Sequence, residues 1–111
     1  MSNKVLELLD DIFVECSSIK EFLLGHTFDS YRKDKKTRFA VERSFEIIGE
    51  ALNRIGRIDT KIIESIREYR GIISFRNVLA HAYDHVEDSI VWGIIERDLD
   101  NLIEDVRHLQ K

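Results

Sequence analysis

The chain has 111 residues, which is enough for one domain and too few for two. Hydrophobic residues at 43%, charged residues at 34% and a net charge of −4 describe a globular protein with a highly charged surface. No apolar run approaches the ~18 residues of a membrane span and the first residues do not form a signal peptide, so we expect a cytoplasmic protein without membrane contact.

The N-terminal third predicts one long helix followed by a polar segment. Residues 3–24 carry apolar side chains at spacings of three and four, as an amphipathic helix does, and Gly25 stands where helices commonly stop. Cys16 falls on the apolar stripe and is expected to be a small core residue; a single cysteine excludes an internal disulfide and a multi-cysteine zinc site. Residues 26–38 are polar and basic, and Asp29 is a candidate cap for a short helical turn.

Residues 37–55 predict a second long helix, with Gly56 at its end. Large apolar side chains form one stripe and small ones a second, which suggests burial against more than one neighbour. Gly49 is interpreted as a point of close helix approach. Glu46 and Glu50 stand four residues apart, and because no histidine lies nearby in sequence, surface or supporting carboxylates are favoured over a metal site.

The C-terminal half predicts further helices and no strand. A helix begins after Asp59 or Thr60, both candidate caps, has a kink or break at Gly71 and continues over residues 72–82. Asp84, followed three residues later by a glutamate, resembles a capping box that opens the last helix, residues 86–108. The prediction is a single all-α domain, an antiparallel bundle of four to five helices.

Residues 74–85 combine Arg76, His81 and Tyr83 on an otherwise apolar segment. Arginine stays protonated and offers a planar fork that matches phosphate oxygens. Histidine, with an unperturbed pKa near ~6.5, exchanges protons around neutrality. The two together can cleave a phosphodiester without a metal: the base activates a ribose 2′-hydroxyl and the guanidinium holds the charge that develops. The substrate would then be RNA, since DNA lacks that hydroxyl.

The spacing of the motif imposes a geometric condition. On an unbroken helix Arg76 and His81 point about 140° apart, whereas Asn77 and His81 share a face. Either the helix bends or ends near His81, or a symmetric partner completes the site. Asn77 is a candidate for orienting the imidazole or binding phosphate, and the pair Glu46 and Glu50 is a candidate for holding Arg76 in place.

Each motif residue also has an ordinary structural interpretation. A helical arginine is usually a surface cation, and a lone histidine is most often a core or cap residue. Tyr83 would by default be a half-buried aromatic. His81 and His85 could offer two metal ligands on a continuous helix, but a helix start at Asp84 interrupts that geometry, so a metal site is a minor alternative. We favour phosphate contact for Arg76 and catalysis for His81.

The distribution of charge is compatible with local RNA contact. Residues 31–83 carry twelve basic and seven acidic side chains, while the segments on either side are acidic. The motif therefore lies in a basic region of an acidic chain. A solvated helical surface explains the same distribution about as well.

The pattern R-x4-H-x-Y, formed by Arg76, His81 and Tyr83, resembles that of the HepT-like toxins. These are small helical ribonucleases of the HEPN superfamily, encoded beside an MntA-type minimal nucleotidyltransferase antitoxin. The resemblance covers nearly the whole chain, although this chain lacks the proline that many relatives carry before the fourth helix. It extends through an amphipathic first helix, Arg43-Ser-Phe-Glu-Ile-Ile-Gly-Glu-Ala-Leu52, Gly71-Ile-Ile-Ser-Phe-Arg-Asn77 and Val91-Trp-Gly-Ile-Ile95.

The resemblance implies a homodimeric HEPN-like bundle with a cleft at the dimer interface and no cofactor or metal. Arg76 and His81 match the nuclease pair, and Tyr83 matches the tyrosine that the antitoxin modifies with AMP. We therefore expect a toxin that acts as an RNA endonuclease, with His81 as general acid/base, Arg76 on the scissile phosphate and Asn77 in support. The expected partners are RNA, a second copy of the chain and the nucleotidyltransferase, in a dimer or a larger complex.

Two other readings of the sequence stay open. The chain could be a non-catalytic helical binding module that docks a nucleotidyltransferase or a nucleotide, or it could be a purely structural dimer. Cleavage products with 2′,3′-cyclic phosphate ends in the presence of EDTA would favour the enzyme. Nucleotide binding without turnover would favour the module.

Overall fold

The computed structural model describes residues 1–81 and 86–111, and within them it contains helices and no strand. This confirms the all-α prediction. None of the helices in the described ranges is long and apolar enough to cross a membrane. The helices, in chain order, are α1 (Asn3–Phe22), α2 (Phe28–Lys33), α3 (Lys35–Ile58), α4 (Thr60–Glu64), α5 (Tyr69–His81) and α6 (Asp88–Gln110).

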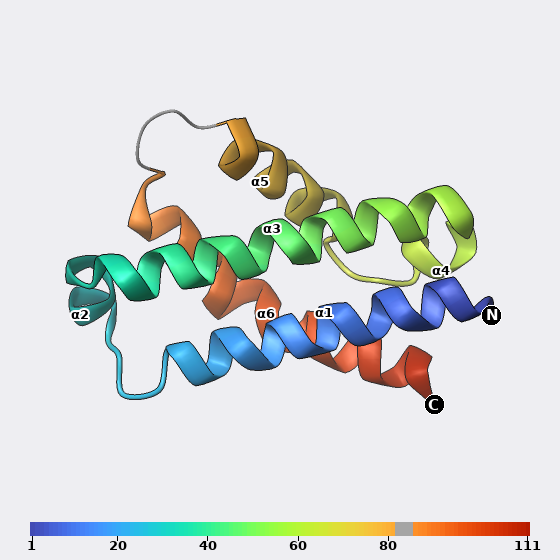
Figure 1. The fold of residues 1–111 in the computed structure, drawn as a ribbon, viewed down its shortest axis with the longest axis horizontal. Helices are drawn as coiled ribbons and strands as arrows, with labels where there is room; N and C mark the ends of the chain where they lie inside the picture. Colours follow the sequence, from blue (N-terminus) through green and yellow to red (C-terminus); the bar gives the residue numbers. More distant parts are fainter. Residues whose placement is uncertain (82–85) are drawn as a thin grey trace.

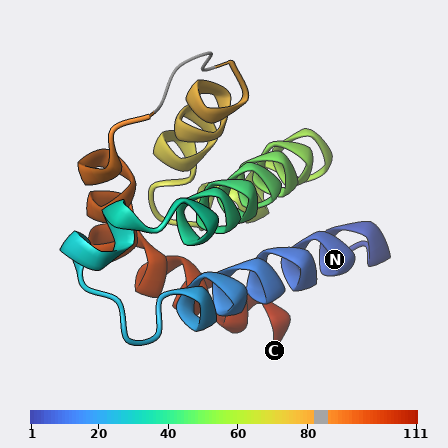
Figure 2. The ribbon, with the colours of Figure 1, turned by 60° about the vertical axis from the view of Figure 1, so that its left-hand side comes forward.

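Helix α3 is the central element of the bundle. It runs antiparallel to α1, and in both ribbon views it lies between α1 and α5 (Figures 1 and 2). Helix α6 packs across α1 and also contacts α2. The central position explains the two stripes of α3: its large apolar side chains are buried, and so are Ser44 and Ala51 from the small-residue stripe. Burial against more than one neighbour is therefore confirmed.

Helix α1 forms where the apolar spacing predicts it. Its stripe is buried, and the Ser2 side chain caps the helix by accepting a hydrogen bond from the Val5 amide at 3.1 Å. Cys16 is fully buried in this stripe, and burial raises the pKa of its thiol to about 12. The helix ends at Phe22, two residues before the predicted end, and Gly25 follows with a φ of 78°.

Two polar side chains, neither of them Asp29, shape the connection from α1 to α3. Thr27 caps α2, because its side chain accepts a hydrogen bond from the Ser30 amide at 3.2 Å. Asp34 caps α3 in the same way. The prediction of Asp29 as a cap is wrong: this carboxylate lies in the first turn of α2 and pairs with Arg32 and with a lysine of the same helix.

The connection from α3 to α5 differs from the prediction at both glycines. Helix α3 continues through Gly56, and Asp59 then caps α4 by accepting from the Ile62 amide at 3.1 Å. The break expected at Gly71 lies earlier, before α5 begins, and Glu68 carries the left-handed backbone there with a φ of 60°. Gly71 is an ordinary position inside α5.

Gly49 brings α3 and α5 into close contact, as its interpretation predicts. A Cβ atom placed on Gly49 would lie 2.2 Å from the Cβ of Arg76 and 2.6 Å from its Cγ. Real Cβ atoms do not approach this closely, so a side chain at residue 49 would displace α5. The absence of a side chain therefore sets the distance between the motif helix and the centre of the bundle.

This packing predicts opposite effects for two glycine substitutions. We expect Gly49→Ala to lower the free energy of unfolding by about 1–3 kcal/mol, because the new methyl group overpacks the α3/α5 contact. Gly93→Ala is the matched control: residue 93 is inside α6 and its added Cβ would meet nothing within 4 Å. It should raise the free energy of unfolding by about 0.5–1 kcal/mol through helix propensity. Urea denaturation of both variants measures the difference, and equal effects would contradict the packing.

Candidate functional site

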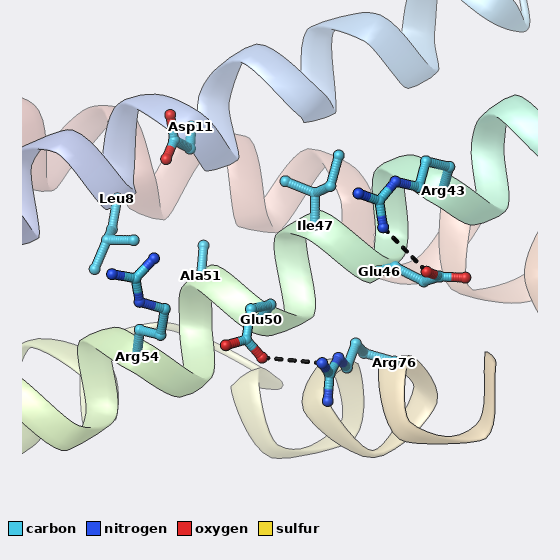
Figure 3. Close-up of a pocket in the computed structure, with 9 residues that line it drawn as sticks. All are labelled: Leu8, Asp11, Arg43, Glu46, Ile47, Glu50, Ala51, Arg54 and Arg76. Carbon is cyan, nitrogen blue, oxygen red and sulfur yellow. Dashed lines mark hydrogen bonds and ion pairs between the residues drawn. The ribbon is translucent and has the colours of Figure 1, made fainter. Parts of the chain in front are cut away.

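Arg76 extends from α5 toward α3, where its guanidinium has two partners. Nη2 lies 3.0 Å from Oε2 of Glu50 on α3, and Nη1 donates a hydrogen bond to Oδ1 of Asn77 at 3.1 Å. The Arg76 side chain is 30% exposed and that of Glu50 is 43% exposed. The ion pair across the two helices is drawn in Figure 3. Of the two carboxylates suggested to hold Arg76, Glu50 therefore forms the contact, whereas Glu46 pairs with Arg43.

This ion pair lies at a pocket of about 210 Å³ between α1, α3 and α5. Three arginines and three carboxylates line it together with apolar side chains (Figure 3). The pocket therefore offers several guanidinium groups to an anionic ligand without an excess of positive charge. Its lining residues are Leu8, Asp11, Arg43, Glu46, Ile47, Glu50, Ala51, Arg54 and Arg76.

The two carboxylates singled out in the sequence have different partners. Glu46 pairs with Arg43 of the same helix at 3.3 Å, whereas Glu50 reaches the motif helix. Both therefore support arginines, in agreement with their interpretation as surface or supporting carboxylates. In residues 1–81 and 86–111, no group of three His, Cys, Asp or Glu side chains has the arrangement of a metal site.

Sequence reasoning missed Arg54, Asp11 and the contribution of Arg43 to this pocket. Arg43 and Arg54 are eleven residues apart, which is about three turns of helix, so they share one face of α3 with Glu50. That spacing was a signal in the sequence. Asp11 had no comparable signal, because only the packing of α1 on α3 brings it to the pocket. Arg54 makes no ion pair within the part of the chain that the structure describes.

His81 is the last residue of α5 and is exposed. Residues 82–85, which follow it, lie outside the described residues, so the end of the helix near His81 stays a prediction. Because α5 is helical from Arg76 to His81, the two side chains leave it about 140° apart within one chain. Both are nevertheless accessible to solvent, and Asn77 is exposed between them.

The last part of the motif segment, residues 82–85, lies outside the described residues. It includes Tyr83, the expected site of modification, as well as Asp84 and His85. The predicted start of the last helix is wrong: α6 begins at Asp88, two residues later than expected, and its N-cap is Glu87, which makes no side-chain capping hydrogen bond. Asp84 is therefore not the cap of this helix.

A buried polar cluster connects the start of α6 with α2 and α3. Arg38 of α3 lies 3.8 Å from Asp88, the first residue of α6, with both side chains largely buried. Tyr31 of α2 is fully buried beside them. Burial raises the pKa of the Tyr31 hydroxyl, and the nearby carboxylates of Glu42 and Asp88 raise it further. The ion pair of Arg38 and Asp88 therefore connects the first residue of α6 to α3.

Comparisons with known proteins agree with the family resemblance of the sequence. The model of the family described as ribonuclease HepT-like matches residues 12–109. A protein of Thermococcus cleftensis, named as a probable ribonuclease HepT, is 35% identical over 86% of both chains. A protein of Methanocaldococcus jannaschii, named as a candidate RNase, is 32% identical over 96% of this chain and 88% of its own length. A protein of Caldanaerobacter subterraneus, also named as a candidate RNase, is 30% identical over 91% of this chain and 89% of its own length. No solved structure gives a significant match.

The ion pair at the pocket predicts a small energetic coupling. Exposed ion pairs contribute little to stability, so a double-mutant cycle of Glu50→Gln and Arg76→Gln should give a coupling below about 1 kcal/mol in the free energy of unfolding. Urea denaturation of the two single variants and the double variant measures this coupling. A coupling of several kcal/mol would mean that the pair is a structural element of the fold.

Proposed function

This chain belongs to the HepT-like ribonuclease family, and we propose that it is a toxin whose Arg76 and His81 cut RNA without a metal. The family implies an RNA substrate. The observation that carries the residue assignment is the placement of Arg76. Its guanidinium contacts Glu50 and Asn77, it lines the pocket and it remains accessible to solvent. The same helix carries the exposed His81.

Each residue has one role in the proposed reaction. The His81 imidazole removes the proton from a ribose 2′-hydroxyl, and the 2′-oxygen then attacks the neighbouring phosphorus. Arg76 donates hydrogen bonds to the phosphoryl oxygens as negative charge develops on them. The bond from phosphorus to the 5′-oxygen breaks, and the imidazolium returns its proton to that oxygen. The products are a 2′,3′-cyclic phosphate and a free 5′-hydroxyl, and Asn77 supports Arg76 through their hydrogen bond.

The proposal includes a second copy of the chain. Arg76 and His81 diverge on one continuous helix, so one molecule does not direct both side chains at the same phosphate. A two-fold symmetric dimer in which α5 of one copy approaches α5 of the other would bring His81 of one chain to Arg76 of its partner. The exposure of both residues supports this arrangement, because it leaves them available to a partner and to RNA.

The proposal also includes silencing by a nucleotidyltransferase of the MntA type. The antitoxin would attach AMP to Tyr83, two residues beyond His81. The adduct would add bulk and a phosphate charge close to the pair, where it competes with RNA for the Arg76 guanidinium. The support for this step is the R-x4-H-x-Y pattern of the sequence.

The central test is cleavage by the His81→Ala variant. We expect a loss of about 10²- to 10⁴-fold in cleavage rate in EDTA, the contribution of a general acid/base. The wild type should leave 2′,3′-cyclic phosphate ends. His108→Ala is the matched control, because His108 is an exposed histidine near the end of α6. Equal cleavage by wild type and His81→Ala, or RNA binding by the wild type without any cleavage, would contradict the nuclease and favour a binding module.

The shared site has a separate test by mixing inactive chains. Consider a dimer of one Arg76→Ala chain and one His81→Ala chain. If the two sites are shared between the chains, one of them keeps both the native arginine and the native histidine. If each site is built within one chain, neither site keeps both. Random pairing makes about half of the dimers mixed, each with one working site of two, so the mixture should recover up to about a quarter of wild-type cleavage. No recovery from mixtures that form dimers on size-exclusion chromatography would contradict the shared site.

A further inference from the structure

The surroundings of Arg76 constrain it more than a surface arginine is usually constrained. At its base, the side chain passes against Gly49, where an added Cβ would lie 2.2 Å from the Arg76 Cβ. At its tip, Glu50, the next residue of α3, lies 3.0 Å from Nη2. Two consecutive residues of one helix therefore contact both ends of the same side chain.

The contact with Glu50 leaves the guanidinium able to bind phosphate. The ion pair and the hydrogen bond to Asn77 engage at most one N–H on each terminal nitrogen. Arginine has five N–H donors, so further donors, Nε–H among them, have no partner in residues 1–81 and 86–111. A phosphate and the Glu50 carboxylate can therefore bind Arg76 at the same time. This favours orientation of the guanidinium by Glu50 over displacement of Glu50 by the substrate.

Glu50 is also distinct from the neighbouring carboxylate of the same pocket. Glu46 pairs within its own helix, with an arginine that is 71% exposed. Glu50 is the one carboxylate in the described ranges that forms an ion pair with the motif helix at Arg76. Glu46 can therefore affect only an arginine of α3, whereas a substitution of Glu50 directly changes the surroundings of Arg76, the residue proposed to bind the phosphate.

We propose that Glu50 is a positioning residue, which orients the Arg76 guanidinium toward the scissile phosphate while Gly49 sets the depth of the side chain. The inference rests on the proposed ribonuclease function. Without the carboxylate, the long arginine side chain samples several rotamers, and only some of them place the guanidinium on the phosphate. The negative charge of Glu50 also repels the RNA backbone. Glu50 therefore improves the turnover of bound RNA at some expense to RNA binding.

This proposal predicts a split between kcat and KM that a structural role would not produce. In Glu50→Gln we expect kcat to fall about 10- to 100-fold, since the guanidinium is misplaced. KM should stay the same or fall, because a negative charge next to a polyanion is removed. The measurement is steady-state cleavage of an RNA with a single cut site, together with the thermal midpoint of unfolding, which should not change appreciably.

Glu104→Gln is the matched control. Glu104 of α6 also pairs with an arginine distant in the chain, since its Oε1 lies 3.3 Å from Nη2 of Arg67 in the connection between α4 and α5, and it does not line the pocket. The substitution is chemically the same and removes the same charge. We expect kcat and KM of this variant to remain at the wild-type values.

A second variant tests whether Glu50 acts through Arg76. Arg76→Lys removes the planar fork, so adding Glu50→Gln to it should lower kcat little further. Additive effects of the two substitutions, or a kcat of Glu50→Gln equal to or above that of the wild type, would overturn the proposal. The latter result would identify Glu50 as a competitor of the phosphate. These outcomes differ from failure of the ribonuclease itself, in which wild type and His81→Ala cleave equally or not at all and both proposals fall.

Discussion

The close contact of α3 and α5 at Gly49 is the constraint on which the site depends. It places the motif helix against the longest helix of the bundle, and it directs Arg76 along the surface of α3 instead of into solvent. The ion pair with Glu50 and the pocket between α1, α3 and α5 both follow from this spacing. The chemistry proposed for the chain is therefore a consequence of how two helices pack, and no irregular loop is needed to place Arg76.

The environment of Arg76 balances two requirements of phosphate recognition. A guanidinium that is partly removed from water interacts more strongly with an anion, and one that is partly exposed can still be reached by a polymer as large as RNA. The carboxylates of the pocket keep the local charge near neutral, which matches the modest net charge of the chain. Affinity for RNA would then come from well-placed hydrogen bonds more than from a general attraction between opposite charges.

Much of the fold could be predicted from the sequence, because helical periodicity and capping are local signals. The apolar stripe of α1 and the close approach at Gly49 were predicted correctly, and the observed cap Asp59 was one of two candidates, the other being Thr60. The errors concern glycines and caps, where contacts with the surrounding structure outweigh the local preference of the sequence. Gly56 and Gly71 lie inside helices, where packing and backbone hydrogen bonds outweigh their poor propensity, and the left-handed position falls instead on Glu68. The divergence of Arg76 and His81 followed from helical geometry alone, whereas the pocket lining needed the three-dimensional packing of α1 on α3.

Gly49 and Glu50 are neighbours in the chain, but their contacts with Arg76 are of different kinds. A side chain at residue 49 would collide with the Cβ of residue 76. The collision would therefore persist if Arg76 were replaced by any other residue that has a Cβ, charged or not. A descendant of this protein that lost its arginine would still lose stability without the glycine, while the glutamate would have no guanidinium left to hold. Among divergent homologues, the glycine would therefore mark inheritance of the architecture, and joint retention of the glutamate and the arginine would mark inheritance of the enzyme.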